Sequence, residues 1–110
     1  MNGSSSVFSW EQQRADDATL VVFQGELDMA TASEALEVLV RAIRDGNVVI
    51  DASALTFIDS SGIRSLVEAY REAHRGIGTD RTVVVRNPSP PVRRVLEVTG
   101  LDRLIEGVDA

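Results

Sequence analysis

The stretch of the chain best suited to chemistry is FIDSSG at residues 57–62, where Asp59 precedes the hydroxyl groups of Ser60 and Ser61. Apolar residues at helical spacing follow it, so we expect these three polar residues at the start of a helix. A hydroxyl there lies at the positive end of the helix dipole, which tolerates an added phosphate. The stretch is therefore a candidate phosphate-acceptor site.

The same three residues also have a simpler interpretation. A small oxygen-bearing side chain at a helix start accepts a hydrogen bond from an N–H group that the helix itself leaves unpaired. Capping and phosphorylation are compatible, so the sequence leaves both interpretations of residues 59–61 open.

A second polar turn, GELDMAT at residues 25–31, precedes another helical pattern. Thr31 and Glu34 have the spacing of a capping box, in which each side chain bonds the other residue's backbone. Asp28 either solvates the turn or belongs to a functional surface, and Gly25 is expected to permit a backbone turn. Strand-to-helix turns are where α/β folds concentrate function, so the two turns are the expected site.

Several reactive residue types are missing or scarce. The chain has no cysteine, its eleven basic residues are all arginine, and His74 is its single histidine. Thiolate, Schiff-base and lysine general-base chemistry are therefore excluded. A serine without a base to activate it is a substrate rather than a nucleophile. We predict that the protein is not an enzyme and carries neither cofactor nor metal.

Charge and hydropathy limit the partners. Eleven basic residues against 17 acidic ones give a net charge of −6, which disfavours nucleic acid and anionic membranes as partners. No apolar run approaches the roughly 20 residues that span a bilayer, and no signal-peptide pattern is present. These features fit a cytoplasmic protein with no membrane or nucleic-acid partner.

The helices and strands that position the two turns are predicted from the spacing of apolar residues. The 110 residues suit one domain, with residues 1–6 as a flexible lead-in and residues 7–110 as the folded part. We expect strands at 7–10, 19–25, 48–50 and 82–85, and helices over 31–45, 63–75 and 92–99, with a further short helix at 101–105. The order β-β-α-β-α-β-α predicts an α/β fold: an early hairpin, a mixed and mostly parallel sheet, and helices packed on it.

Four blocks of the chain, in the same order and spacing, resemble the STAS domain family. They are FIDSSGI at 57–63, GELD at 25–28 with Thr31, VVID at 48–51, and VRRVL at 92–96 followed by TGL at 99–101. The resemblance covers residues from about 7 to 108. It is strongest to the stand-alone bacterial anti-sigma factor antagonists.

The resemblance implies a specific regulatory role. In this family the first serine after the aspartate is the phosphate acceptor, which corresponds to Ser60. The partner is an anti-sigma factor that is also a serine kinase. The unphosphorylated antagonist binds it and releases the sigma factor. Phosphate from the kinase's ATP then breaks the complex, and a serine phosphatase restores binding. The antagonist itself needs no cofactor and is expected to be a monomer when free.

The resemblance and the two turns together predict a partner-binding surface. Its members are Glu26, Asp28, Thr31, Asp59, Ser60, Ser61, Gly62 and Arg64. Ser61 is expected to be a cap or a neighbour of the acceptor. Arg64 stands where smaller residues are also common in the family, so it is a candidate for tuning partner choice.

Two alternatives remain beside this interpretation. The first keeps the STAS fold but makes the protein a ligand-binding or scaffold module without a phosphorylation switch. The second is a receiver-like domain that holds Mg²⁺ between Asp28, Asp51 and Asp59 and is phosphorylated on aspartate. The missing lysine and the early hairpin argue against the second alternative.

Overall fold

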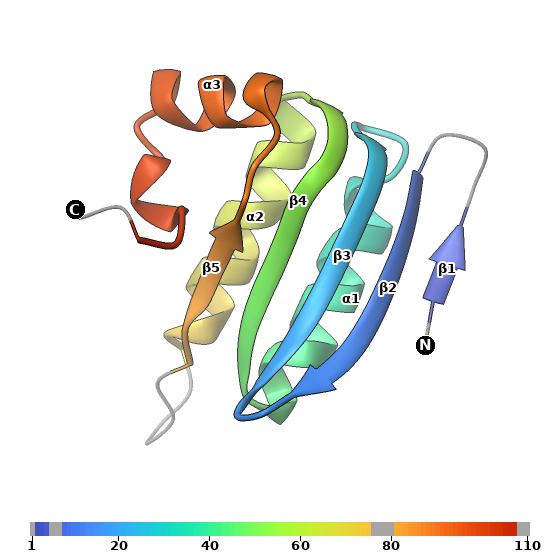
Figure 1. The fold of residues 1–110 in the computed structure, drawn as a ribbon, viewed down its shortest axis with the longest axis vertical. Coiled ribbons are helices and arrows are strands. Elements are labelled where there is room, and N and C mark those ends of the chain that lie inside the picture. The colour runs from blue at the N-terminus through green and yellow to red at the C-terminus, as the bar shows by residue number, and fades with distance from the viewer. Residues whose placement is uncertain (1, 5–7, 76–80, 108–110) are drawn as a thin grey trace.

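The computed structural model describes residues 2–4, 8–75 and 81–107. The chain order of the elements is shown in Figure 1. The strands are β1 (Asn2–Ser4), β2 (Phe8–Ala15), β3 (Ala18–Leu27), β4 (Asn47–Ile58) and β5 (Val83–Arg86). The helices are α1 (Ala32–Asp45), α2 (Ser60–Ala73) and α3 (Pro90–Val98), followed by the short 3-10 helix η1 (Asp102–Leu104).

The strands form one sheet in the order β1-β2-β3-β4-β5. β2 and β3 make the expected antiparallel hairpin, while β3 with β4 and β4 with β5 are parallel. Each parallel pair is joined through a helix, because parallel neighbours need a long crossover. The predicted mixed α/β fold with helices packed on its sheet is confirmed.

The amino-terminal strand is the main departure from the predicted order. The sequence predicts a flexible lead-in over residues 1–6, yet Asn2–Ser4 pairs antiparallel with β2. With this added pair, the described sheet has two antiparallel and two parallel strand pairs. The segment Asn-Gly-Ser has no alternating apolar pattern. Its pairing rests on backbone hydrogen bonds, which leave no signal in the sequence. Val7, expected to start the next strand, lies outside the described residues.

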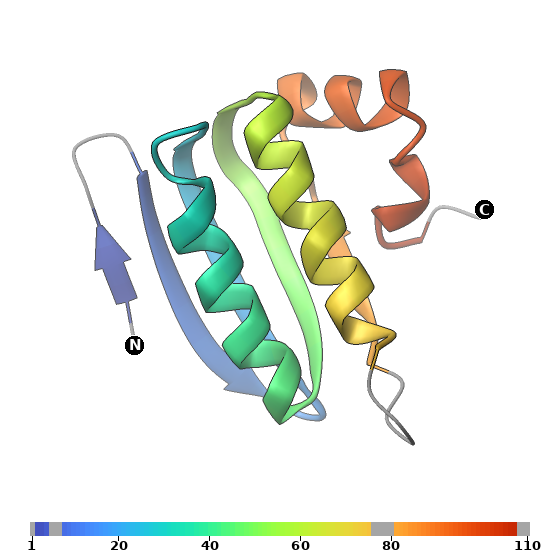
Figure 2. The same ribbon diagram turned by 180° about the vertical axis from the view of Figure 1, so that it is seen from behind.

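The core lies between the sheet and the two long helices. Figure 2 shows α1 and α2 side by side on one face of the sheet. Thr19, Val21 and Phe23 of β3 point to this face and are fully buried, whereas Leu20 and Val22 alternate to the opposite face and are half-buried. Burial of this apolar face against the helices stabilises the fold and holds the ends of β3 and β4 in place.

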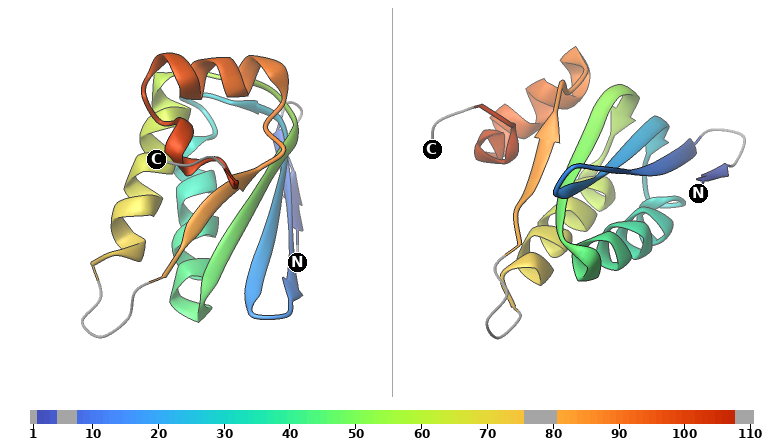
Figure 3. Two further views of the ribbon diagram at one scale, coloured as in Figure 1. Left: turned by 60° about the vertical axis from the view of Figure 1, so that its left-hand side comes forward. Right: turned by 60° about the horizontal axis from the view of Figure 1, so that its bottom comes forward.

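The last part of the described chain completes the sheet edge. α3 lies at the end of the sheet where β4 ends (Figure 3). The short helix expected at 101–105 is the 3-10 helix η1, after which Ile105 pairs in parallel with Val85. Arg86 donates two hydrogen bonds to the Glu106 carboxylate, at 2.9 and 3.1 Å. This segment therefore covers the outer side of β5 and reduces its exposure as an edge strand.

Candidate functional site

The two polar turns lie next to each other at one end of the sheet. β3 and β4 are parallel, and their last residues, Leu27 and Ile58, are register partners, so the loop after β3 and the turn after β4 leave the sheet side by side (Figures 1 and 2). The Asp59 N–H donates to the Leu27 carbonyl at 3.2 Å and ties the turns together. Gly25 has a φ of 95°, the left-handed backbone that glycine adopts without strain, and the strand register shifts there.

Asp59 is the cap of α2. Its carboxylate accepts a hydrogen bond from the Gly62 N–H at 3.0 Å, which satisfies one of the unpaired groups at the helix start. Ser60 is then the first helical residue, and its side chain is exposed. Among the residues the structure describes, neither the Ser60 nor the Ser61 hydroxyl has a hydrogen-bond partner. The capping role therefore belongs to the aspartate, which leaves the Ser60 hydroxyl accessible from solvent.

Gly62 has a packing role. A Cβ at this position would lie 2.6 Å from the Leu27 carbonyl oxygen and 2.7 Å from Cγ1 of Ile58. Only a residue without a side chain lets the first turn of α2 pack this tightly against the end of β3. Gly62 is buried, so it supports the surface from beneath rather than forming part of it.

Thr31 holds the turn after β3 in place. Its side chain is only 5% exposed. The hydroxyl accepts a hydrogen bond from the Asp28 N–H at 3.0 Å and donates one to the Glu26 carbonyl at 3.0 Å. The Asp28 carboxylate in turn accepts from the Ala30 N–H at 3.0 Å. These hydrogen bonds hold the turn in one conformation, and the Thr31 side chain is too buried to contact a partner.

The predicted capping box between Thr31 and Glu34 is wrong. Thr31 stands at the cap position but makes no side-chain cap hydrogen bond. The Glu34 carboxylate accepts instead from the Trp10 indole N–H at 2.7 Å. In the observed arrangement, the buried Thr31 hydroxyl and the Trp10 indole N–H both have hydrogen-bond partners. Satisfying these two groups stabilises the fold more than the local capping box would.

Two of the eight residues predicted to form the partner-binding surface are buried. The exposed or half-buried members are Glu26, Asp28, Asp59, Ser60, Ser61 and Arg64. Thr31 and Gly62 are buried beneath them. The surface above the turns is mainly acidic, and Arg64 brings a positive charge to it.

Two exposed apolar side chains flank the site, and neither is among the site residues that the sequence predicts. Met29, in the loop after β3, is 81% exposed, and Phe57, near the end of β4, is 46% exposed. Large apolar side chains exposed beside a polar site are typical of protein-binding surfaces. The available signal was their position: Met29 stands inside the polar turn after β3, and Phe57 stands two residues before Asp59.

A groove of about 230 Å³ runs between α1 and α2 next to Ser60. Its lining residues are Met29, Ala32, Ser33, Leu36, Ser61, Arg64, Ser65 and Glu68. The groove is shallow, and four of its eight lining residues, Ala32, Ser33, Ser61 and Ser65, have small side chains. Its shape suits a protruding side chain of another protein better than an enclosed small molecule.

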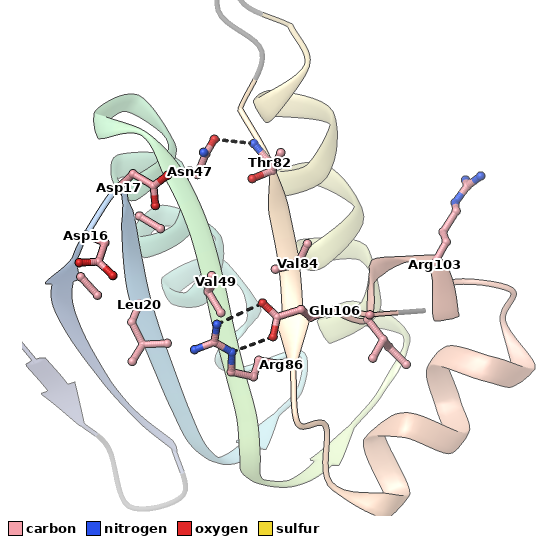
Figure 4. Close-up of a pocket in the computed structure, with 14 residues that line it drawn as sticks. Asp16, Asp17, Leu20, Asn47, Val49, Thr82, Val84, Arg86, Arg103 and Glu106 are labelled. Atoms are coloured by element: carbon pink, nitrogen blue, oxygen red, sulfur yellow. Dashed lines mark hydrogen bonds and ion pairs between the residues drawn. The ribbon is translucent and has the colours of Figure 1, made fainter. Parts of the chain in front are cut away.

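A second groove, of about 580 Å³, lies on the sheet face opposite α1 and α2 (Figure 4). Leu20, Val49 and Val84 form its floor, and the ion pair between Arg86 and Glu106 crosses one side. The hydrogen bond from Arg86 holds the pKa of Glu106 below its ordinary value. The groove adjoins the turn between β2 and β3, at the end of β3 opposite the Ser60 site.

Within residues 2–4, 8–75 and 81–107, no group of three or more histidine or acidic side chains could hold a metal ion. No helix of that part of the chain is long and apolar enough to cross a membrane.

Comparison with known proteins identifies the class of this fold and site. A sequence model of the STAS domain matches residues 9–109, so the chain belongs to the STAS domain family. An anti-sigma factor antagonist from Mycobacterium paratuberculosis is 31% identical, with a TM-score of 0.73 over 90% of this chain and 83% of that one.

The anti-sigma factor antagonist SpoIIAA is similar in two forms. Its unphosphorylated structure is 26% identical, with a TM-score of 0.71 over 92% of this chain and 87% of that one. The phosphorylated form from Bacillus is 25% identical, with a TM-score of 0.64 over 92% and 90%. The family resemblance inferred from the four sequence blocks is confirmed.

Proposed function

We propose that this protein is an anti-sigma factor antagonist that is switched by phosphorylation of Ser60. The observation that carries the proposal is the Ser60 hydroxyl, exposed at the first residue of α2 and free of hydrogen bonds to the described residues. Two similar proteins, from Mycobacterium paratuberculosis and Bacillus, are anti-sigma factor antagonists, and SpoIIAA exists in a phosphorylated form.

The partner in this proposal is an anti-sigma factor that is also a serine kinase. The Ser60 oxygen attacks the γ-phosphorus of ATP bound to the kinase, the bond to ADP breaks, and the hydroxyl proton passes to a base on the kinase. The antagonist supplies only the acceptor hydroxyl, so it is a regulator rather than an enzyme and needs no cofactor. A serine phosphatase reverses the modification.

Binding in the unphosphorylated state uses the surface around Ser60. Met29 and Phe57 supply exposed apolar contacts, and the neutral hydroxyl lies in the same surface. A phosphate adds about −1.5 to −2 charges next to Asp59 and near Asp28. Burying that charge in an interface without a new cation costs several kcal/mol, and about 1.4 kcal/mol already changes affinity tenfold. Phosphorylation is therefore sufficient to break the complex.

Mass spectrometry after incubation with ATP, Mg²⁺ and each candidate anti-sigma kinase tests the proposal. We expect one added phosphate on Ser60 with one of the kinases. Ser61→Ala, which removes the neighbouring hydroxyl, should be modified normally, whereas Ser60→Ala should not be modified. Ser60→Ala should also stay bound to the kinase in the presence of ATP. Phosphate on Ser61, or no modification by any active kinase, would contradict the proposal.

The second candidate function is a STAS module that binds a ligand without a phosphorylation switch. The groove of about 580 Å³ over Leu20, Val49 and Val84 is the observation that favours it. This groove lies away from Ser60, so ligand binding there would be unaffected by Ser60→Asp. Loss of kinase binding in Ser60→Asp would instead support the switch.

A further inference from the structure

Arg64 is an arginine of α2 that has no anionic partner among the residues the structure describes. Glu68 lies four residues after it, but the Glu68 carboxylate pairs with Arg71 at 2.9 Å. Acidic residues pair better with a base that follows them in a helix than with one that precedes them, which explains this choice. Within the described residues, no carboxylate pairs with Arg64.

Ser60 lies one helical turn before Arg64. Residues four apart in a helix share a face, with their Cβ atoms about 5–6 Å apart. Both side chains are exposed, so each is free to move toward the other. A phosphate on Ser60 would be an anion that precedes a base by four residues, which is the favoured order and the opposite of Arg64 followed by Glu68.

We propose that the phosphate on Ser60 forms an intramolecular ion pair with Arg64. The inference rests on the proposed function, because it takes Ser60 as the acceptor. Guanidinium groups bind phosphate oxygens through two parallel hydrogen bonds, so an arginine suits this role better than a lysine.

The pair gives phosphorylation a second effect on the partner-binding surface. Arg64 lines the groove between α1 and α2, together with Met29 and Ser61. Pairing with the phosphate draws the guanidinium toward the start of α2 and neutralises it. A partner that contacts Arg64 in the unphosphorylated protein therefore loses that cation at the moment it meets the new negative charge.

The pKa of the second ionisation of the phosphate is sensitive to this ion pair. The ordinary pKa of this ionisation is about 6. Asp59 beside it, Asp28 on the neighbouring loop and Glu68 on α2 are carboxylates that raise this pKa, whereas Arg64 lowers it. A comparison of variants at one position isolates the contribution of Arg64, because the carboxylates stay unchanged.

Phosphorus-31 NMR titration of protein with genetically encoded phosphoserine at position 60 is the test. We expect Arg64→Gln to raise the phosphate pKa by about 0.3 unit, the effect of an exposed pair at this spacing. Arg64→Lys should raise it less. Arg75→Gln, which removes the same charge from an arginine paired with Glu72 beyond the end of α2, should leave the pKa unchanged. The difference should shrink at about 1 M salt, where the Debye length is about 3 Å.

An unchanged pKa in Arg64→Gln, or an equal rise in Arg75→Gln, would overturn the inference. Because the phosphoserine is installed during translation, this result is independent of any kinase. Failure of the proposed function is recognised separately, as absence of phosphate on Ser60 in the kinase assay.

Discussion

Gly62 of α2 packs directly against the carbonyl group of Leu27 at the end of β3, where a Cβ at position 62 would lie 2.6 Å from the oxygen. The same carbonyl accepts the Asp59 N–H. One backbone oxygen thus joins the turn that carries Ser60 to the turn that carries Asp28. The close approach keeps both turns in one surface.

Substitution of Gly62 tests this close packing. We expect Gly62→Ala to lower the free energy of unfolding by about 1–3 kcal/mol, because the methyl group forces the helix start away from Leu27 and Ile58. Urea denaturation measures the change. Ser61→Ala, in the same turn of α2, is the control and should change stability by less than about 0.5 kcal/mol. Equal stability of Gly62→Ala and the unmodified protein would contradict the packing argument.

A second prediction concerns the buried hydroxyl of Thr31. Thr31→Val keeps the shape of the side chain but leaves the Asp28 N–H and the Glu26 carbonyl without their hydrogen bonds, at a cost of about 1–3 kcal/mol. Thr31→Ser should retain most of the stability, since it keeps the hydroxyl. Hydrogen exchange of the Asp28 amide should accelerate in the valine variant only. Equal exchange rates in the two variants would count against this role.

A third prediction concerns binding through the exposed apolar side chains of Met29 and Phe57, beside Ser60. Met29→Ala and Phe57→Ala should each weaken binding to the anti-sigma partner by about tenfold or more, as expected for apolar side chains that become buried in an interface. Val98 on α3 offers a matched control, because it is 77% exposed but belongs to neither turn. Titration calorimetry with the purified partner gives the affinities. An equal loss in Val98→Ala would mean that the contact surface extends beyond the two turns.

The pair between Arg86 and Glu106 predicts a dependence on pH. The hydrogen bond from Arg86 lowers the pKa of Glu106 in the folded protein. A carboxyl group whose pKa is lower when folded contributes stability above its unfolded pKa, and that contribution is lost as the pH falls through the folded value. Carbon-13 NMR titration of the Glu106 carboxyl should give a higher pKa in Arg86→Gln than in the unmodified protein. An equal pKa of Glu106 in the two proteins would contradict the pairing.

Much of the architecture follows from local patterns in the chain. The run Val48-Val49-Ile50, the spacing of apolar residues in the two long helices and the turn at Asp16-Asp17 predict the hairpin, the parallel strands and their order. These patterns are readable because strands and helices repeat their buried positions every two or 3.6 residues. The β1 strand follows none of these patterns, because the segment Asn-Gly-Ser contains no apolar residue whose spacing could indicate a strand.

The sequence by itself determined the fold class and the position of the two polar turns, and its resemblance to the STAS family predicts Ser60 as the phosphate acceptor. Only the tertiary structure decided that Asp59 is the cap, that Thr31 is buried and that Met29 and Phe57 are exposed. Burial and hydrogen-bond partners depend on residues that are distant in the sequence. The indole of Trp10, for example, takes the Glu34 carboxylate that a local pattern assigns to Thr31. Such pairings exist only once the sheet brings separate strands and helices together.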